Sequence, residues 1–334
     1  MDNPLISVIM ANYNTSIGYL KEAIDSVLSQ TYSFFEFIII DDASSNGSVS
    51  IIEDYDDNRI KLIVNEKNIG LTKSLNKALR LAQGKYVIRM DSDDISLPER
   101  FRNQVDYMEE HPDVIVCGTW FEKFGVENRV RKPIINDTEY YRCQLLFSNT
   151  PITMCHPSVI MRKSMLEYYH IQYDESVKKA QDYALWVECS KHGNMAILQK
   201  VLLRYRTHEK QISIDKKEEQ NSYAERISRT QLSLLGIIYQ EEEKRWRYDI
   251  VKTQKEYLSF YTWIEKIIKA NHEKNVYDNQ VLAEYLDNKL KNAIKRLGFR
   301  EKAKTYLFTN KKSRSLFRGL VFHSILKRIG HEKA

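Results

Sequence analysis

Acidic and amide side chains follow three apolar, strand-like runs in this sequence of 334 residues. They are Asn12-Tyr13-Asn14, Asp41-Asp42 and Asp91-Ser92-Asp93-Asp94. In an open parallel sheet, ligands bind outside the carboxyl ends of the strands, so we expect these side chains to gather at one edge. Clustered carboxylates repel one another unless a cation shares the site, and oxygen donors suit Mg²⁺ or Mn²⁺. The pattern therefore predicts a divalent-metal site.

The Asp-Ser-Asp-Asp stretch is the most informative of the three. In extended backbone, residues i and i+2 point to the same face, so Asp91 and Asp93 would face the edge while Asp94 points away. Magnesium is typically held by one or two protein carboxylates together with substrate phosphates, which suits a nucleotide diphosphate. The alternative is a solvated turn before a helix. The two companion strand ends favour the metal site.

Strand-like and helix-like segments alternate through the first 120 residues. Apolar and β-branched runs predict strands at 6–11, 34–40, 60–64, 86–90 and 113–121. Helical spacing predicts helices at 19–30 and 70–82, and Ser96-Leu-Pro-Glu99 resembles a capping box that opens a helix through about Glu110. Short links between such elements imply an α/β fold, with a mostly parallel sheet flanked by helices.

Composition is ordinary for a globular protein, with 43% apolar and 29% charged residues. No run approaches the roughly 18 apolar residues of a membrane-spanning helix, and the N-terminus lacks the pattern of a secretory signal. The four cysteines form no CxxC pair, which favours a reducing compartment. We therefore expect a cytoplasmic protein.

Basic residues are concentrated at the C-terminal end. Between Lys289 and Ala334, fourteen Lys and Arg stand against two Glu, a net charge of +12, which leaves −6 for the first 288 residues. Apolar residues at 316–329 recur at helical intervals, which predicts an amphipathic helix on an anionic membrane or, equally, one packed on the body. The acidic body argues against nucleic acid as a partner. We place a domain boundary near residue 213, before an almost wholly helical region at 214–334.

The sequence resembles the family 2 glycosyltransferases in three stretches: ISVIMANYN, SVLSQTYSFFEFIIIDDAS and NIGLTKSLNKALRLAQGKYVIRMDSDDISLPERF. The resemblance covers residues 4–120 closely and continues more loosely to about 213. It implies a GT-A fold in residues 1–213 and inverting transfer of a sugar from a nucleotide-sugar, a UDP-sugar, with Mn²⁺ or Mg²⁺ as cofactor. The implied acceptor is a glycan or a lipid-linked oligosaccharide in bacterial surface polysaccharide assembly, at a peripheral site on the inner face of the membrane if the tail binds lipid.

The resemblance also implies roles for the strand-end residues. The nucleotide would be held by Ala11, Tyr13, Asp41, Asp42 and Asp91. Asp42 would accept a hydrogen bond from uracil, whereas Asp41 would support the loop or, equally, cap a turn. Asp91 would lie near the ribose and the metal, and Asp93 would be the main metal ligand. Lys73 is placed near the donor, although a solvated helix face explains a lone lysine better.

Three later segments complete the resemblance. In Gln181-Asp182-Tyr183-Ala184-Leu185-Trp186, the resemblance makes Asp182 the catalytic base, with Gln in place of the commoner Glu before it. Without the resemblance, Asp182 would be an acid in the first turn of a helix. His208 would be a metal ligand or an exposed loop histidine. His156-Pro157-Ser158 would border the acceptor or form a structural turn.

Two rival functions remain open from the sequence. A sugar nucleotidyltransferase shares the sheet topology, but it would need a Gly-rich basic loop where Asn12-Tyr13-Asn14 stands. A catalytically inactive, nucleotide-binding scaffold subunit is the other rival, against which the intact Asp91, Asp93 and Asp182 argue.

Overall fold

The computed structural model describes residues 3–147, 154–208, 217–238 and 240–298. The chain forms two compact units, which we call the sheet unit (Met1–Thr138 and Thr150–Ala224) and the helical unit (Glu139–Asn149 and Glu225–Ala334). The chain therefore passes between the units three times, and we had predicted no such short excursion at 139–149. The boundary near residue 213 stays a prediction, because residues 209–216 lie outside the described part.

Among the described residues, nine strands form one sheet in the order β3-β2-β1-β4-β8-β6-β9-β5, with β7 paired to β6. They are β1 (Ile6–Asn12), β2 (Phe35–Asp41), β3 (Ile60–Val64), β4 (Tyr86–Asp91), β5 (Ile95–Ser96), β6 (Val114–Gly125), β7 (Arg129–Arg131), β8 (Ile160–Arg162) and β9 (Asn194–Thr207). The first four strands that we predicted, β1 to β4, pair in parallel. The predicted α/β fold is confirmed, and β5, β7 and β8 add antiparallel pairs.

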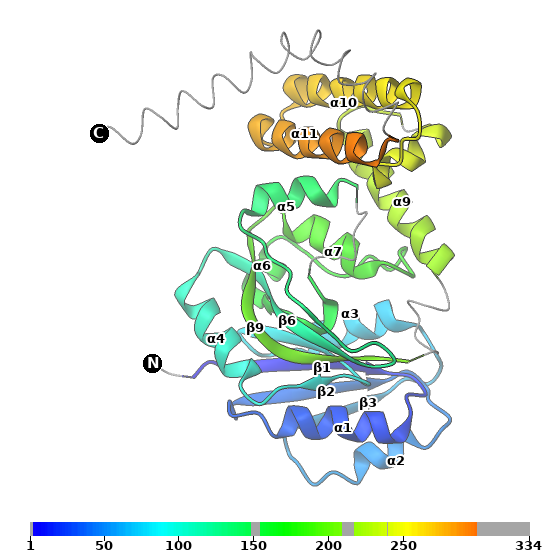
Figure 1. Cartoon of the computed structure of the whole chain (residues 1–334). Coiled ribbons are helices and arrows are strands. Elements are labelled where there is room, and N and C mark those ends of the chain that lie inside the picture. The colour runs from blue at the N-terminus through cyan, green and yellow to red at the C-terminus, as the bar shows by residue number, and fades with distance from the viewer. Residues whose placement is uncertain (1–2, 148–153, 209–216, 239, 299–334) are drawn as a thin grey trace, which may run out of the picture. The chain divides into compact units, whose positions relative to one another are not determined.

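Helices cover both faces of the parallel strands. Helices α1 (Ile17–Leu28) and α2 (Ser48–Glu53) lie on one face, and α3 (Leu71–Leu81) lies on the other (Figure 1). Every residue of β2 is buried, as expected for a strand covered on both sides. The remaining helices of the sheet unit are α4 (Arg100–Glu110), the short 3-10 helix η1 (His156–Ser158), α6 (Lys163–Tyr168) and α7 (Gln181–Cys189).

The predicted helix start at Ser96 is wrong. Helix α4 begins at Arg100, and the residue before it, Glu99, makes no side-chain capping bond. Ser96 instead lies in β5, where it pairs with Leu203 of β9 and its backbone N–H donates to Ser26 Oγ at 3.0 Å. Pairing with a distant strand thus overrides a local capping pattern.

The helical unit confirms the predicted helical C-terminal region. It contains most of α5 (Thr138–Leu145), the C-terminal part of α9 (Lys217–Leu234), η2 (Glu241–Tyr248), α10 (Gln254–Lys274) and α11 (Asn279–Arg296). Its core combines three residues of the excursion with aromatic and aliphatic residues of the later helices: Cys143, Leu146, Phe147, Phe260, Trp263, Ile267, Leu286 and Leu290. The excursion is therefore part of this core.

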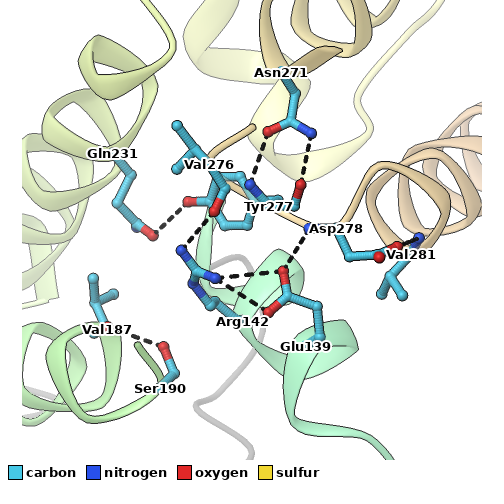
Figure 2. Close-up of polar contacts among 10 residues, drawn as sticks. All are labelled: Glu139, Arg142, Val187, Ser190, Gln231, Asn271, Val276, Tyr277, Asp278 and Val281. Carbon is cyan, nitrogen blue, oxygen red and sulfur yellow. Dashed lines mark hydrogen bonds and ion pairs between the residues drawn. The ribbon is translucent and has the colours of Figure 1, made fainter. Parts of the chain in front are cut away.

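Polar contacts fasten the excursion to the turn between α10 and α11 (Figure 2). Glu139 accepts a hydrogen bond from the backbone N–H of Asp278 at 2.9 Å, and Arg142 donates to the carbonyl of Val276 at 2.8 Å. Asn271 bonds both the N–H and the carbonyl of Tyr277, each at 2.9 Å. These bonds satisfy backbone groups that a turn between helices would otherwise leave unpaired.

Within the described residues, no helix is long and apolar enough to cross a bilayer. The predicted amphipathic helix at 316–329 and most of the basic tail lie outside the described residues.

Candidate active site

Three carboxylates meet where β4 ends. Asp91 is the last residue of β4, Ser92 and Asp93 form a turn, and Asp94 leads into β5. One oxygen from each of Asp91, Asp93 and Asp94 lies within 4.8 Å of the others. The prediction that Asp94 points away is wrong, because the turn interrupts the extended backbone on which the alternation depends.

The three carboxylates repel one another electrostatically. Burial raises the pKa of Asp93, the charge of Asp91 raises it further, and His208 and Arg89 offset part of the rise. Burial and the neighbouring Asp93 and Asp91 hold the pKa of Asp94 well above its ordinary value. A hard divalent cation would relieve this repulsion, and carboxylate oxygens are the donors that such a cation prefers. The set therefore fits Mg²⁺ or Mn²⁺.

His208 directly follows β9 and contacts this cluster. Its Nε2 lies 3.1 Å from Oδ2 of Asp93, and its ring centroid lies 5.9 Å from that of Tyr19 on α1. The structure thus brings together two residues that are 115 positions apart in the sequence, and the role of His208 as a metal ligand stays a prediction. The imidazole can serve a metal when neutral or balance Asp93 when charged.

Arg89 lies two residues before Asp91 on β4. Its side chain is 3% exposed and forms an ion pair with Oδ1 of Asp91. Its Nε and Nη1 have no hydrogen-bond partner among the described residues. Sequence reasoning did not single out Arg89, although a charge inside the apolar run Tyr86–Met90 is a sign of a buried partner.

Asp182 is the second residue of α7. The residue before this helix, Ala180, has φ of 59°, a left-handed conformation that a residue with a Cβ adopts at some cost. Asp182 Oδ1 accepts a hydrogen bond from the N–H of Tyr183 at 2.8 Å. Burial raises the pKa of Asp182, and the charge of Asp91 adds to the rise, whereas the Tyr183 N–H and Arg89 oppose it. Asp182 therefore lies within electrostatic reach of Asp91, one of the three clustered carboxylates, and of Arg89, which is paired with it.

His156, the first residue of η1, is buried. Its Nε2 lies 2.7 Å from the hydroxyl of Tyr173, and its ring meets that of Trp186 edge to face at 6.0 Å. Burial and the charge of Arg89 hold the pKa of His156 well below its ordinary value. Sequence reasoning missed Tyr173, which lies in a segment without a recognisable motif.

The loop after β1 is joined to the loop after β2. Asn12 Nδ2 donates to Asp41 Oδ2 at 2.7 Å and to Ser44 Oγ at 3.2 Å. The N–H of Ser44 donates to Asp41 Oδ1 at 2.8 Å, and Asp41 is fully buried. Asp41 thus stabilises the loop that follows β2. Tyr13, the next residue after β1, is 54% exposed, so its ring is available to a ligand.

Asp42 is buried and anchors the start of α3. Oδ1 accepts from Asn65 Nδ2 at 2.8 Å and from the N–H of Ile69 at 2.9 Å, and Oδ2 accepts from the N–H of Gly70 at 2.8 Å. A carboxylate offers about four lone-pair positions, so Oδ2 keeps one for a further donor. An interaction with a uracil N–H stays a prediction.

The other two residues that were predicted to lie near the nucleotide differ in their exposure. Ala11 is partly buried near the end of β1, whereas Lys73 on α3 is exposed. Lys77, one helical turn later, is the lysine that reaches back to the strand ends, with Nζ 2.8 Å from Oδ1 of Asn65. Sequence reasoning missed both residues, although Asn65 is the polar residue directly after β3 and Lys77 is a lysine on α3.

Comparison with known proteins is consistent with this architecture. Residues 7–169 match the family model described as glycosyl transferase family 2. An uncharacterised glycosyltransferase of Methanocaldococcus jannaschii is 34% identical over 229 residues, covering 67% of this chain and 78% of that protein. The amylovoran biosynthesis glycosyltransferase AmsE of Erwinia amylovora is 32% identical over 213 residues, covering 60% and 76%. The crystal structure of S. aureus TarS 1–349 in complex with UDP-GlcNAc superposes with a TM-score of 0.57 at 20% identity, covering 86% of this chain and 89% of that one.

Proposed function

Because this chain belongs to glycosyltransferase family 2 and has its GT-A fold, we propose that it transfers a sugar from a UDP-sugar to a glycan or lipid-linked acceptor, with inversion at the anomeric carbon. AmsE is named as a glycosyltransferase of amylovoran biosynthesis, and we place this chain in the assembly of a bacterial surface polysaccharide. The observation that carries the proposal is the convergence of Asp91, Asp93 and Asp94 beside Arg89, whose charge also acts on Asp182.

The residues divide the chemistry between two sides. On the acceptor side, Asp182 takes the proton of the attacking hydroxyl while that oxygen bonds to the anomeric carbon. A raised pKa suits this role, because a more basic carboxylate is the better proton acceptor. On the donor side, the bond between the anomeric carbon and the diphosphate oxygen breaks, and the electron pair leaves with UDP.

The donor side needs positive charge where the diphosphate leaves. Asp91 and Asp93 would hold Mg²⁺ or Mn²⁺, with His208 as a neighbour of Asp93. When bound, the cation supplies charge neutralisation to the departing diphosphate. Asp42 and Tyr13 would receive the nucleoside, and buried Asp41 would hold the adjoining loop in place, since these residues lie at the ends of neighbouring strands.

A panel of nucleotide-sugars tests this proposal. Release of the nucleotide is measured with Mn²⁺ and with EDTA, for wild type, Asp93→Asn and the surface control Asp106→Asn, whose side chain is 56% exposed on α4. We expect UDP release from a UDP-sugar that EDTA and Asp93→Asn abolish and Asp106→Asn preserves. UDP binding without release from any donor would instead indicate an inactive scaffold, and turnover that survives both EDTA and Asp93→Asn would refute the metal assignment.

A further inference from the structure

Arg206, near the end of β9, contacts two consecutive residues of the carboxylate turn. Its backbone N–H donates to Oδ1 of Asp94 at 2.8 Å, and its Nε donates to the carbonyl oxygen of Asp93 at 2.8 Å. The residue is buried, with 9% exposure. One arginine therefore fixes a side chain and a backbone group of the two residues whose carboxylates repel each other.

The guanidinium of Arg206 is itself tightly held. It lies between two rings, 4.1 Å from the centroid of Tyr19 on α1 and 4.5 Å from that of Phe124 on β6. It also forms an ion pair with Glu22, one turn along α1 from Tyr19. A partly desolvated cation near aromatic faces is attracted by the negative potential of the two ring quadrupoles. Elements α1, β6 and β9 thus determine where the guanidinium lies.

The carboxylate turn needs anchors of this kind. Asp91, Asp93 and Asp94 lie within 4.8 Å of one another, and their mutual repulsion would open the turn if nothing restrained it. Ser92, between them, is held by a hydrogen bond of 2.7 Å between its hydroxyl and that of Thr15. Arg206 restrains the other half of the turn and leaves the Asp93 carboxylate to face His208.

We propose that the Arg206 side chain is a positioning group, which holds the Asp93 backbone so that the Asp93 carboxylate is placed to bind a divalent cation, an inference that rests on the proposed function. The bond to Asp94 comes from the backbone N–H and is kept in every variant at position 206. Residues that orient metal ligands typically change metal affinity by roughly 10–100-fold when they are replaced. Lysine is a poor substitute, because one ammonium cannot reproduce the planar fork that reaches both the Asp93 carbonyl and Glu22.

Arg204 provides a matched control on the same strand. Its guanidinium lies 4.3 Å from the centroid of Phe124 and its Nε is 2.9 Å from Oε2 of Glu122. In the part of the chain that the structure describes, its side chain makes no hydrogen bond to residues 91–94. Arg204→Met therefore removes a similar cation from the same ring without touching the carboxylate turn.

The test measures Mn²⁺ binding directly. Free Mn²⁺ is followed by electron paramagnetic resonance as full-length protein is titrated in the presence of UDP, for wild type, Arg206→Met, Arg206→Lys, Arg204→Met and Asp93→Asn. We expect the Mn²⁺ dissociation constant of Arg206→Met to rise at least about tenfold, with a smaller rise for Arg206→Lys and none for Arg204→Met. Thermal unfolding of each variant shows whether the fold is retained.

Each outcome has a definite meaning. Wild-type Mn²⁺ affinity in folded Arg206→Met, or equal losses in Arg206→Met and Arg204→Met, would overturn the positioning role. If Arg206→Met does not fold, Arg206→Lys decides by the same criterion. Absence of Mn²⁺ binding by wild type, or unchanged binding by Asp93→Asn, would overturn the metal site of the proposed function, and the role of Arg206 with it.

Discussion

Replacing Asp182 by Asn should remove the catalytic base while leaving its local structure intact. The Asn side chain has the same shape, and its Oδ1 can still accept the 2.8 Å hydrogen bond from the Tyr183 N–H that Asp182 accepts. Such a bond contributes about 0.5–1.5 kcal/mol, so keeping it preserves the start of α7. The variant loses the negative charge and, with it, the ability to take a proton.

The expected loss of turnover follows from this role. A positioned general base typically contributes about 10²–10⁴-fold to the rate. At roughly 1.36 kcal/mol for each factor of ten, Asp182→Asn should raise the activation free energy by about 3–5 kcal/mol. Affinity for UDP should not change, because the nucleotide residues Asp41 and Asp42 lie on β2 and on the loop that follows it.

The stability of the variant should change in the opposite direction from its activity. Burial raises the pKa of Asp182 in the folded protein, so the native state binds the proton more tightly than the unfolded chain does. The contribution of Asp182 to stability therefore falls as the pH rises from the ordinary Asp pKa, about 3.9, through the raised native pKa. Asp182→Asn carries no such charge and should be at least as stable as wild type at pH 8, an advantage that disappears in acid.

Three measurements check this prediction: initial rates of UDP release, calorimetric titration with UDP, and thermal unfolding at acid and alkaline pH. Asp174→Asn is the matched control, because exposed Asp174 also accepts a backbone N–H, from Ser176 at 2.8 Å. A rate for Asp182→Asn within about tenfold of wild type would refute the assignment of the base. A variant that is markedly less stable than wild type at pH 8 would refute the electrostatic reasoning.

Two further predictions concern the frame around the site. Asp42→Asn should lower both the melting temperature and the UDP affinity. In this variant an amide nitrogen would face the N–H of Ile69 or Gly70, at a cost of about 1–3 kcal/mol. Unchanged unfolding and UDP titration curves would contradict this prediction. Gly84→Ala should destabilise the fold by about 1–3 kcal/mol, because the new Cβ would lie 2.5 Å from the backbone nitrogen of Ser7. If Gly84→Ala unfolds at the wild-type temperature, the chain before β4 can move away from β1 at little cost, and this prediction is wrong.

The parallel strands and their loops were predictable from local patterns. Continuous apolar runs identified β1, β2 and β4, because strands covered on both faces have no polar side. The polar residues at their ends were visible for the same reason. Asp94 was misplaced because a two-residue turn interrupts the alternation, which spacing alone does not reveal.

The partners of those residues were not predictable, because they come from far along the chain. Arg206 bonds Asp94 across 112 residues, and β5 exists only through its pairing with β9. Arg89 was visible as an anomaly, but nothing in the sequence says that it pairs with Asp91 while its charge also acts on Asp182. Long-range pairing therefore decides the electrostatics of the site.

The short excursion of the chain into the helical unit limits how such proteins can be recombined. Residues 139–147 contribute Cys143, Leu146 and Phe147 to a core otherwise built by residues after 225. A chimera that replaces only the C-terminal segment from residue 225 would combine the α5 of one parent with the helices of another. Both segments must be transplanted together, so a graft from a relative needs three splice points rather than one.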